Sequence, residues 1–226
     1  FRFSQWDPAN PKNKYEGTKK QWDHAQSVMA KILDDLGVKY DIGIDEAAFY
    51  GPKLDIQYKN VYGKEDTLVT IQIDMLLAER FGMYYTDENG EKKLPYIIHR
   101  TSLGCYERTL AYLIEHYAGA LPTWMAPEQV RFLPVTDRAV DYCKEQAAKL
   151  TAQGYRVTVD TRSEKIGKKI RDAQMEKIPY MLVVGDRDIE AGTVSPRHRA
   201  DGDLGAMTLD AFTAVLKDVV DNKLQK

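Results

Sequence analysis

The chain has 226 residues, a length that suits one large domain or two small ones. Its 43% of hydrophobic and 29% of charged residues are ordinary proportions, so we expect a soluble globular protein. No apolar run approaches the length of a membrane span, and a formal net charge of −2 does not indicate nucleic-acid binding by the whole chain. The two cysteines form neither a disulfide framework nor a Cys-x-x-Cys zinc pattern, and we expect a reducing, cytoplasmic environment.

The first elements are predicted to be a strand, a loop, a helix and a second strand. The opening run, Phe-Arg-Phe-Ser-Gln-Trp, has no initiator Met and is typical of an edge strand entered midway, so we expect a fragment of a longer protein. Residues 7–17 predict a loop, and an amphipathic helix is predicted from residue 18 or 19 to 36, before a short strand over 38–44. Its inward residues are expected to be Trp22, Ala25, Met29, Ile32, Leu33 and Leu36.

An aromatic turn with a lysine after it is the first candidate for chemistry. Residues 47–56 read Ala-Ala-Phe-Tyr-Gly-Pro-Lys-Leu-Asp-Ile, in which Gly-Pro predicts a turn and the alternation after it predicts a strand. Lys53 begins this strand and could bind a phosphate or a carboxylate, although a lone Lys after a turn usually lies on the surface. Gln72, on a strand predicted over 67–73, could bind a base or ribose edge, or could point outward.

The stretch from residue 74 to residue 100 predicts a short helix followed by a hairpin. The helix is expected over 74–81, the hairpin strands over 81–86 and 92–100, and an Asn-Gly signal marks the turn between them. We expect the strand over 92–100 to be the buried, central strand of an antiparallel sheet with helices on one side.

The central strand continues through a turn into a helix. It ends at His99 and Arg100, and from residue 105 apolar residues recur at helical spacing until Gly119. Leu110, Leu113, Ile114 and Tyr117 form the expected apolar face. Arg108 lies in the first turn, where helix amides favour anions and an Arg adds a planar fork for phosphate and a flat face for a base. A solvated surface position is the usual alternative for such an Arg.

Two runs in this part of the chain resemble a known family. Residues 103–108 (Leu-Gly-Cys-Tyr-Glu-Arg) and residues 121–130 (Leu-Pro-Thr-Trp-Met-Ala-Pro-Glu-Gln-Val) are similar to motif 3 of class II aminoacyl-tRNA synthetases and to its exit into the anticodon-binding domain. Among these, the chain most resembles bacterial threonyl-tRNA synthetases. The resemblance implies part of an antiparallel catalytic sheet with helices over 1–126. It also implies a small α/β anticodon-binding domain with a mixed sheet over 127–226.

The resemblance also implies an activity, partners and site residues. The whole protein would be a homodimeric ligase that activates L-threonine with ATP and Mg²⁺ and transfers it to tRNA(Thr). Arg108 and Lys53 would be catalytic, and the residues that bind ATP or substrate would be Tyr50, Gln72, Glu107 and Arg108. The motif 2 Arg is not found in this sequence, so we expect the fragment itself to be inactive.

His99 is the one metal ligand that the resemblance implies. In the full-length enzyme it would hold Zn²⁺ together with a Cys and a second His, and the remaining zinc position would bind threonine. A histidine at the end of a buried strand is more often a hydrogen-bonded core residue. No other Cys or His of this sequence matches the missing ligands, and one imidazole cannot make a stable site. We therefore expect weak zinc binding or none in this chain alone.

Beyond residue 127, strands and helices alternate, which predicts an α/β domain. Strands are expected over 130–135, 155–159, 179–185 and 193–199, and helices over 138–153, 164–177 and from 208. Between residues 162 and 199, nine Lys or Arg stand against six Asp or Glu, an excess that could bind RNA or could be an ordinary solvated surface. The resemblance implies that Lys165, Arg171, Asp188 and Arg197 face the anticodon.

Two alternative functions remain open at this point. The α/β domain could bind tRNA while the first half is a non-catalytic scaffold. The chain could also derive from a sister class II synthetase, prolyl or glycyl, that shares the C-terminal fold. His99 at the strand end before the Leu-Gly-x-x-Glu-Arg run favours the threonyl branch.

Overall fold

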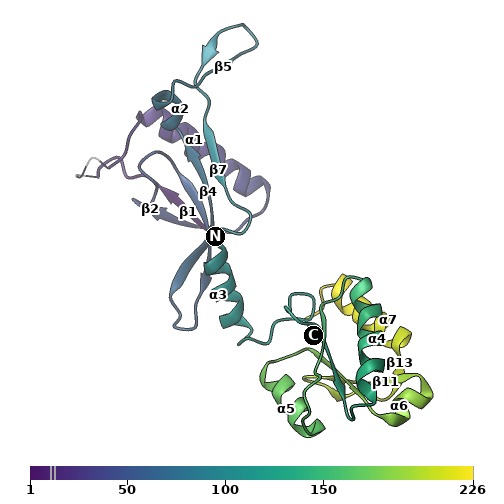
Figure 1. Cartoon of the computed structure of the whole chain (residues 1–226). Coiled ribbons are helices and arrows are strands. Elements are labelled where there is room, and N and C mark those ends of the chain that lie inside the picture. The colour runs from purple at the N-terminus through teal and green to yellow at the C-terminus, as the bar shows by residue number, and fades with distance from the viewer. Residues whose placement is uncertain (11, 13, 226) are drawn as a thin grey trace. The chain divides into compact units, whose positions relative to one another are not determined.

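The computed structural model describes residues 1–10, 12 and 14–225, and the chain divides into two compact units, Phe1–Tyr112 and Leu113–Lys226 (Figure 1). Each unit has its own sheet and its own buried core. None of the helices in the described residues is both long enough and apolar enough to span a membrane.

The first unit is built on a five-stranded sheet with the order β2-β1-β3-β4-β7. Its strands are β1 (Arg2–Gln5), β2 (Asp41–Ile44), β3 (Lys53–Lys59), β4 (Glu65–Asp74) and β7 (Ile97–Arg100). β1 and β2 pair in parallel, and the other neighbours are antiparallel. The predicted antiparallel sheet is therefore confirmed.

The hairpin before β7 differs from the prediction. Only β5 (Tyr85–Thr86) and β6 (Lys92–Lys93) pair there, so the predicted long strands over 81–86 and 92–100 are wrong. β7 lies at the edge of the sheet, not at its centre, and Ile98 is 58% exposed. The apolar sequence of this strand predicted that it belongs to a sheet, but it could not show whether the strand has one neighbour or two.

One helix covers one face of this sheet. α1 (Lys19–Asp35) starts at Thr18, which forms a capping box with Gln21. Its Met29 and Leu33 pack on Leu54 from β3. Of the expected inward residues, Trp22, Ala25, Met29 and Leu33 are buried, whereas Ile32 and Leu36 are 52% and 71% exposed.

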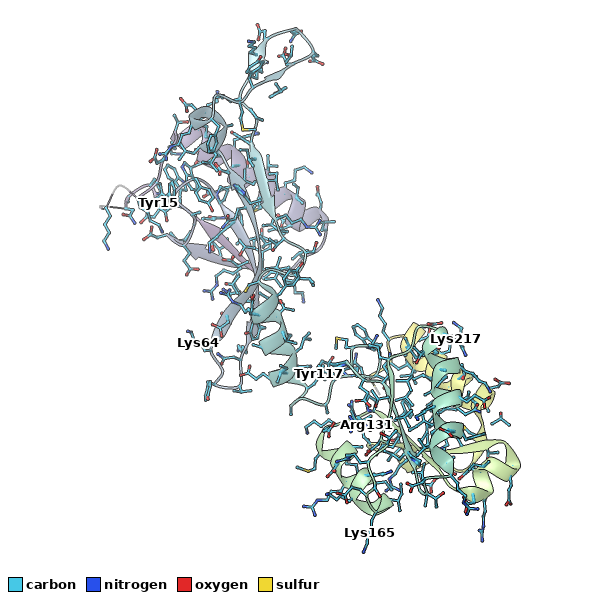
Figure 2. All side chains as sticks on the ribbon, in the orientation of Figure 1. Tyr15, Lys64, Tyr117, Arg131, Lys165 and Lys217 are labelled. Carbon is cyan, nitrogen blue, oxygen red and sulfur yellow. The ribbon has the colours of Figure 1, made fainter. Side chains whose placement is uncertain are left out.

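A cluster of aromatic rings fixes the start of α1 on the unit. Trp22 is fully buried and stacks on Trp6 with ring centroids 5.2 Å apart. Tyr15, labelled in Figure 2, meets Trp22 edge to face at 5.2 Å. The Trp22 indole N–H donates to the Glu16 main-chain oxygen at 2.8 Å, so its one polar atom is satisfied.

Two short helices follow β4 and β7. α2 (Leu77–Arg80) confirms the short helix expected there, and α3 (Tyr106–His116) confirms the helix that carries Arg108. No residue of α3 is buried, and Leu110 and Ile114 are 53% and 50% exposed. Leu113 and Tyr117 are half-buried, so the described residues cover the expected apolar face only in part.

The second unit is built on a six-stranded mixed sheet with the order β12-β11-β10-β8-β9, and β13 also pairs with β11. Its strands are β8 (Val130–Pro134), β9 (Val157–Val159), β10 (Tyr180–Val184), β11 (Thr193–His198), β12 (Gly202–Asp203) and β13 (Met207–Thr208). Its helices are α4 (Ala139–Ala152), α5 (Ile166–Met175), α6 (Asp186–Ala191) and α7 (Leu209–Asp221). β8, β9 and β10 are parallel and β11 is antiparallel to β10, as expected for a mixed sheet.

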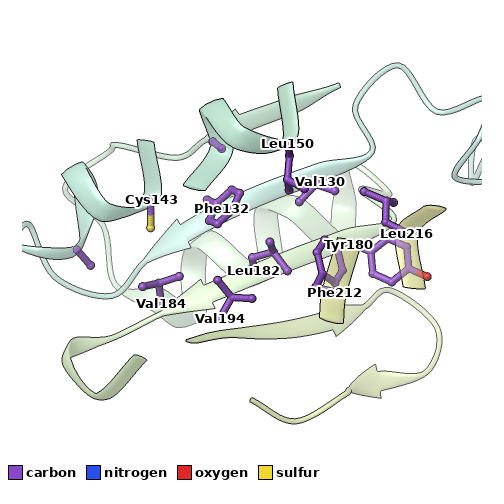
Figure 3. Packing of buried hydrophobic residues seen from close by; sticks show 12 residues of the cluster. Val130, Phe132, Cys143, Leu150, Tyr180, Leu182, Val184, Val194, Phe212 and Leu216 are labelled. Carbon is purple, nitrogen blue, oxygen red and sulfur yellow. The ribbon is translucent and has the colours of Figure 1, made fainter. Parts of the chain in front are cut away.

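This second sheet is covered on both faces. Phe132 and Leu182 pack in a core shared with α4 and α7 (Figure 3). Leu133 follows Phe132 in β8, and Met181 precedes Leu182 in β10. Both therefore point to the other face of the sheet, where they pack with Ala173 of α5. Burial on both faces explains why these strands read as continuous apolar runs. α6, β12 and β13 were not predicted, and because β12 pairs with β11, β11 lies inside the sheet and not at its edge.

Two arginines of the second unit hold residues 120–126, which lie near its start. Arg199 donates to the main-chain oxygens of Ala120 and Leu121 at 2.8 and 2.7 Å. Arg156 donates to those of Ala126 and Trp124 at 2.8 and 3.0 Å. Residues 120–126 therefore pack with the second unit, before the boundary after residue 126 that the sequence suggested.

Candidate functional site

Polar side chains line up across three neighbouring strands of the first sheet. The antiparallel ladders pair Lys53 of β3 with Gln72 of β4, and Gln72 with His99 of β7. Residues directly opposite each other share a face of the sheet. The neighbouring residues Leu54 and Ile71 pack on the side of α1, so the polar row lies on the opposite face.

Hydrogen bonds connect Gln72 and His99 to two further residues. The Tyr50 hydroxyl donates to Gln72 Oε1 at 2.5 Å, and the Tyr50 and His99 ring centroids are 6.0 Å apart. His99 Nε2 lies 2.9 Å from Asp74 Oδ2. Burial and the nearby Asp74 charge raise the pKa of Tyr50, so its hydroxyl remains a donor at neutral pH.

Asp74 is the buried anchor of this network. It is fully buried, and its Oδ1 accepts the main-chain N–H groups of Leu76 and Leu77, both at 2.9 Å. Burial alone would raise the pKa of Asp74, but the hydrogen bonds from His99, Leu77 and Leu76 outweigh it and the pKa is lowered. An ionised Asp74 can accept a proton that His99 carries on Nε2, so this contact orients the imidazole ring.

Lys53 is held by a second buried carboxylate. Its Nζ lies 2.7 Å from Asp55 Oδ2, and Asp55 is 2% exposed. Thr70 donates its hydroxyl to Asp55 Oδ1 at 2.7 Å. The ammonium is therefore fixed beside the polar row by an ion pair that is itself oriented by a neighbouring strand.

Two glycines bring the remaining residues against β4. A Cβ on Gly51 would lie 1.7 Å from the Ile73 main-chain oxygen, so only glycine lets the turn that carries Tyr50 pack so closely on the end of β4. Gly104 has a φ of +66°, and a Cβ there would lie 2.0 Å from the Leu68 main-chain oxygen. This second turn leads into α3 and delivers Arg108 to the same strand.

Arg108 completes a cavity of about 300 Å³. Its Nη1 donates to the Thr67 main-chain oxygen at 2.7 Å, and it lines the cavity together with Gln72 and His99. Tyr50 and Lys53 do not line this cavity themselves. Tyr50 is connected to the cavity by its hydrogen bond to Gln72. Lys53 is connected through Asp55, which accepts a hydrogen bond from the lining residue Thr70.

Glu107, next to Arg108 in the sequence, is held by a cysteine. Its carboxylate accepts the Cys105 thiol at 3.0 Å and does not bind Arg108. This thiol hydrogen bond is the main reason that the pKa of Glu107 is lowered. The position of Glu107 in the first turn of α3 also suits the positive end of the helix dipole.

The residues present do not fit a zinc site of their own. Within the described part of the chain, no three His, Cys, Asp or Glu side chains are grouped so that they could hold a metal ion. His99 is placed by Asp74 as a metal ligand would be, but a structural or catalytic zinc needs at least three protein ligands.

The four residues expected to face an anticodon lie on one side of the second sheet. Lys165 and Arg171 belong to the start and the body of α5, and Lys165 is exposed at the outer end of that helix (Figure 2). Arg197 pairs in register with Met181, which packs on the α5 side of the sheet. Its Nε is buried and has no hydrogen-bond partner among the described residues.

Asp188 lies on α6 and is engaged within the protein. Its carboxylate accepts the Gly185 N–H and the Ser195 hydroxyl, both at 2.9 Å, and the Thr193 hydroxyl at 3.3 Å. These bonds cap the first turn of α6 and tie it to β11. The same contacts place Asp188 on the face of β11 that carries Arg197, two residues beyond Ser195.

Sequence reasoning missed three buried charged residues. Asp55 and Asp74 hold the first site, and Lys169 lies 4% exposed beside Lys165 in the wall of a second cavity of about 450 Å³. Lys169 follows the inward Ile166 by three positions and precedes the inward Ala173 by four. Helical spacing alone could therefore have placed it on the inner face of α5.

Comparison with known proteins assigns both units. A family model described as "tRNA synthetase class II core domain (G, H, P, S and T)" matches residues 12–117, and one described as "Anticodon binding domain" matches residues 129–219. The threonine–tRNA ligase of Clostridium perfringens is 58% identical over 212 residues, which are 94% of this chain and 33% of that protein. That of Clostridium botulinum is 54% identical over 223 residues, 99% of this chain and 34% of that protein.

Solved structures agree with these matches. The RNA-binding domain of threonyl-tRNA synthetase from Cryptosporidium parvum has a TM-score of 0.84 at 32% identity, over 96% of this chain and 54% of that chain. A putative threonyl-tRNA synthetase from Aeropyrum pernix has a TM-score of 0.73 at 25% identity, over all of this chain and 55% of that one.

The chain therefore carries a class II aminoacyl-tRNA synthetase core domain followed by an anticodon-binding domain. Within that class it is a homologue of threonine–tRNA ligases, and it spans about a third of the length of the curated relatives it matches. The resemblance drawn from residues 103–108 and 121–130 is confirmed.

Proposed function

We propose that the protein to which this chain belongs is a threonine–tRNA ligase. It would activate L-threonine with ATP and Mg²⁺ and transfer the amino acid to tRNA(Thr). The observation that carries this proposal is the polar row of Lys53, Gln72 and His99 beside the cavity that Arg108 completes. A nucleotide needs a cation for its phosphates, a flat face for its base and polar groups for its edges, and this arrangement supplies all three.

The proposed roles follow from the positions of the side chains. Arg108 would bind the ATP phosphates or stack on the base, and Lys53 would stabilise charge that develops on the phosphates. Tyr50 and Gln72, joined by their hydrogen bond, would present one oriented polar surface to the substrate. Glu107 would also belong to the ATP site. Its charge would act at the start of α3, and not through an ion pair with Arg108.

Activation of threonine by such a site depends on positioning more than on proton transfer. The carboxylate of threonine would attack the phosphate next to the ribose, and pyrophosphate would leave. Fixed cations lower the cost of the charge that builds up in this step, because they do not have to reorganise. Asp55 and Asp74 contribute by holding Lys53 and His99 before any ligand binds.

The experiment that tests this function is threonine-dependent exchange of pyrophosphate into ATP. The longer protein that contains this segment is compared with its Arg108→Ala variant, and Arg80→Ala is the control. Arg80 is an exposed arginine that pairs with Glu16 at 3.0 Å and does not line the cavity. Loss of exchange in the first variant alone supports the proposal, and equal exchange in both would refute it.

The same assay with a panel of amino acids separates the sister enzymes. Activation of proline or glycine by the longer protein, in place of threonine, would overturn the threonyl assignment. Zn²⁺ would belong to the longer protein, with His99 as one ligand, and would need further ligands from outside this sequence.

For the chain by itself we propose RNA binding without catalysis. The second unit has a complete mixed sheet with both faces covered, whereas the sequence holds no match to the motif 2 Arg. Lys165, Arg171, Asp188 and Arg197 would bind the anticodon of tRNA(Thr). Threonine-dependent exchange by the isolated chain would contradict this proposal, and so would equal binding of RNAs with matched and altered anticodons.

The remaining proposals concern the setting of the protein. We place the functional boundary between the two domains after residue 126, between the two family matches. A homodimer and a cytoplasmic location are proposed for the longer protein. Size-exclusion chromatography with light scattering tests the first, and fractionation of cells tests the second.

A further inference from the structure

A buried lysine joins two strand ends in the second unit. Lys169 is 4% exposed, and its Nζ donates to the main-chain oxygens of Pro134 at 3.0 Å and Asp160 at 3.1 Å. Pro134 is the last residue of β8, and Asp160 directly follows β9. Because these strands are parallel neighbours, a single ammonium bridges their carboxyl ends. Lysine is almost never this buried without a partner, so the position has a specific structural use.

The two loops that leave these strand ends form the walls of one cavity. Residues 135–137 follow β8, and residues 162–165 lead into α5. Both loops line the cavity of about 450 Å³, and Lys169 lines it as well. Carboxyl ends of parallel strands are where α/β sheets usually bind ligands. The bridge made by Lys169 therefore sets the distance between the two walls of this cavity.

The loop after β9 is held a second time through its side chains. Asp160 accepts the main-chain N–H of Arg162 at 3.1 Å and its Nε and Nη2 at 2.9 and 2.7 Å. The Nη1 of Arg162 reaches Asp172 of α5 at 2.9 Å. The hydrogen bonds from Arg162, with the charge of Lys169 as a further cause, lower the pKa of Asp160, so the carboxylate remains ionised at neutral pH.

We propose that Lys169 is a positioning residue of the RNA-binding face. It holds the loops over 135–137 and 162–165 in the arrangement that discriminates an anticodon, without neutralising an RNA phosphate itself. Its burial and its two main-chain acceptors separate it from exposed cations such as Lys165. Loops that are ordered before binding spare the complex the entropy of ordering them. This inference rests on the RNA-binding function proposed above.

The test uses the whole 226-residue chain and two labelled RNAs. One is an anticodon stem–loop with a threonine anticodon, and the other is the same RNA with the anticodon changed. Fluorescence anisotropy gives the affinity of both over a series of KCl concentrations. Lys169→Met removes the ammonium but keeps the length of the side chain. Lys144→Met is the matched control, because it removes the same charge from α4, where the side chain is 59% exposed and its ion-pair partner, Asp141, lies outside both loops.

The expected result separates positioning from direct phosphate contact. Lys169→Met should weaken binding of the matched RNA by about tenfold, since two buried charge-assisted hydrogen bonds are lost. Binding of the altered RNA should change by less than about twofold, and the slope of log K against log[KCl] should stay the same. Lys144→Met should leave the preference for the matched RNA intact.

Three outcomes would overturn the inference. A salt slope that falls by about one unit in Lys169→Met would show that the ammonium neutralises a phosphate. Full discrimination by folded Lys169→Met would show that the bridge does not matter for reading the RNA. No preference for the matched RNA in the unaltered chain would refute the RNA-binding function, and the inference with it.

A second variant decides the matter if Lys169→Met does not fold. Asp160→Asn keeps the main-chain oxygen that Lys169 binds but weakens the hold on Arg162, so it loosens the same loop from its exposed side. Circular dichroism checks its fold. A folded Asp160→Asn chain should also lose its preference for the matched RNA while keeping its salt slope, and an unchanged preference would count against the role of this loop.

Discussion

Replacing Gly104 by alanine tests whether the close approach of its turn to β4 builds the first site. A Cβ at this position would lie 2.0 Å from the Leu68 main-chain oxygen, and φ is +66°. The left-handed conformation alone costs an ordinary residue about 1–2 kcal/mol. Leu68 lies between Thr67 and Val69, which both pair with β3, so its backbone cannot move freely, and the overlap should add about 1–3 kcal/mol. We therefore expect Gly104→Ala to lower the free energy of unfolding of the first unit by about 2–5 kcal/mol.

A matched glycine separates the two contributions. Gly63 has a φ of +76° in the turn between β3 and β4, and a Cβ there would meet no atom within 4 Å. Gly63→Ala should therefore cost only the conformational part, about 1–2 kcal/mol.

Urea unfolding followed by tryptophan fluorescence measures the difference. Trp6 and Trp22 stack within the first unit, and a Trp124→Phe background removes the signal of the second. Fitting each unit separately is necessary because a chain of two units need not unfold in one step. Equal destabilisation by Gly104→Ala and Gly63→Ala would refute the argument, because the turn would then not press on β4 and would not fix Arg108.

Two further predictions concern charged groups that are hydrogen-bonded within the fold. The pKa of Asp74 is lowered in the folded state, so its carboxylate stabilises the first unit above the ordinary Asp pKa, and this contribution disappears as the pH falls through the folded pKa. Near neutral pH, Asp74→Asn should be less stable than the unaltered chain by about 1–3 kcal/mol, and it should lose less stability when the pH is lowered. Urea unfolding of both proteins in acid and neutral buffers measures this, and an equal loss of stability in acid would contradict the prediction. Arg199 donates to three main-chain oxygens, so Arg199→Met should destabilise the second unit by about 2–4 kcal/mol in thermal unfolding. The exposed Arg187→Met is its control, and an equal shift in both variants would show that the three hydrogen bonds contribute little.

Local patterns in the sequence predicted most elements of both units, because periodicity and caps depend on neighbouring residues only. Thr18 and Thr208 cap α1 and α7, close to where the sequence predicted these helices to begin. The apolar runs at 130–135 and 179–185 form strands of a sheet that is covered on both faces. The same patterns cannot fix which strand lies beside which. β7 has an apolar sequence but one neighbour, and its place at the edge follows from pairing alone.

The first site shows the same limit at the level of single residues. Gln72 and His99 were placed on strands from sequence, but their alignment with Lys53 depends on the register of two ladders. β3 and β4 also shift register between Ile56 and Gln57, which no local pattern indicates. The roles of Tyr50 and Arg108 in the site depend likewise on two glycines whose contacts are distant in sequence.

Buried carboxylates explain why this polar face keeps its shape. Asp55 and Asp74 are 2% and 0% exposed on the face opposite α1, and each accepts hydrogen bonds from neighbouring strands or turns. Had either been left unpaired, its burial would destabilise the sheet by several kcal/mol. Paired as they are, they fix Lys53 and His99 through the fold and not through a ligand. A nucleotide bound as proposed above would therefore meet groups that are already oriented, and its binding energy could act on the reacting phosphate.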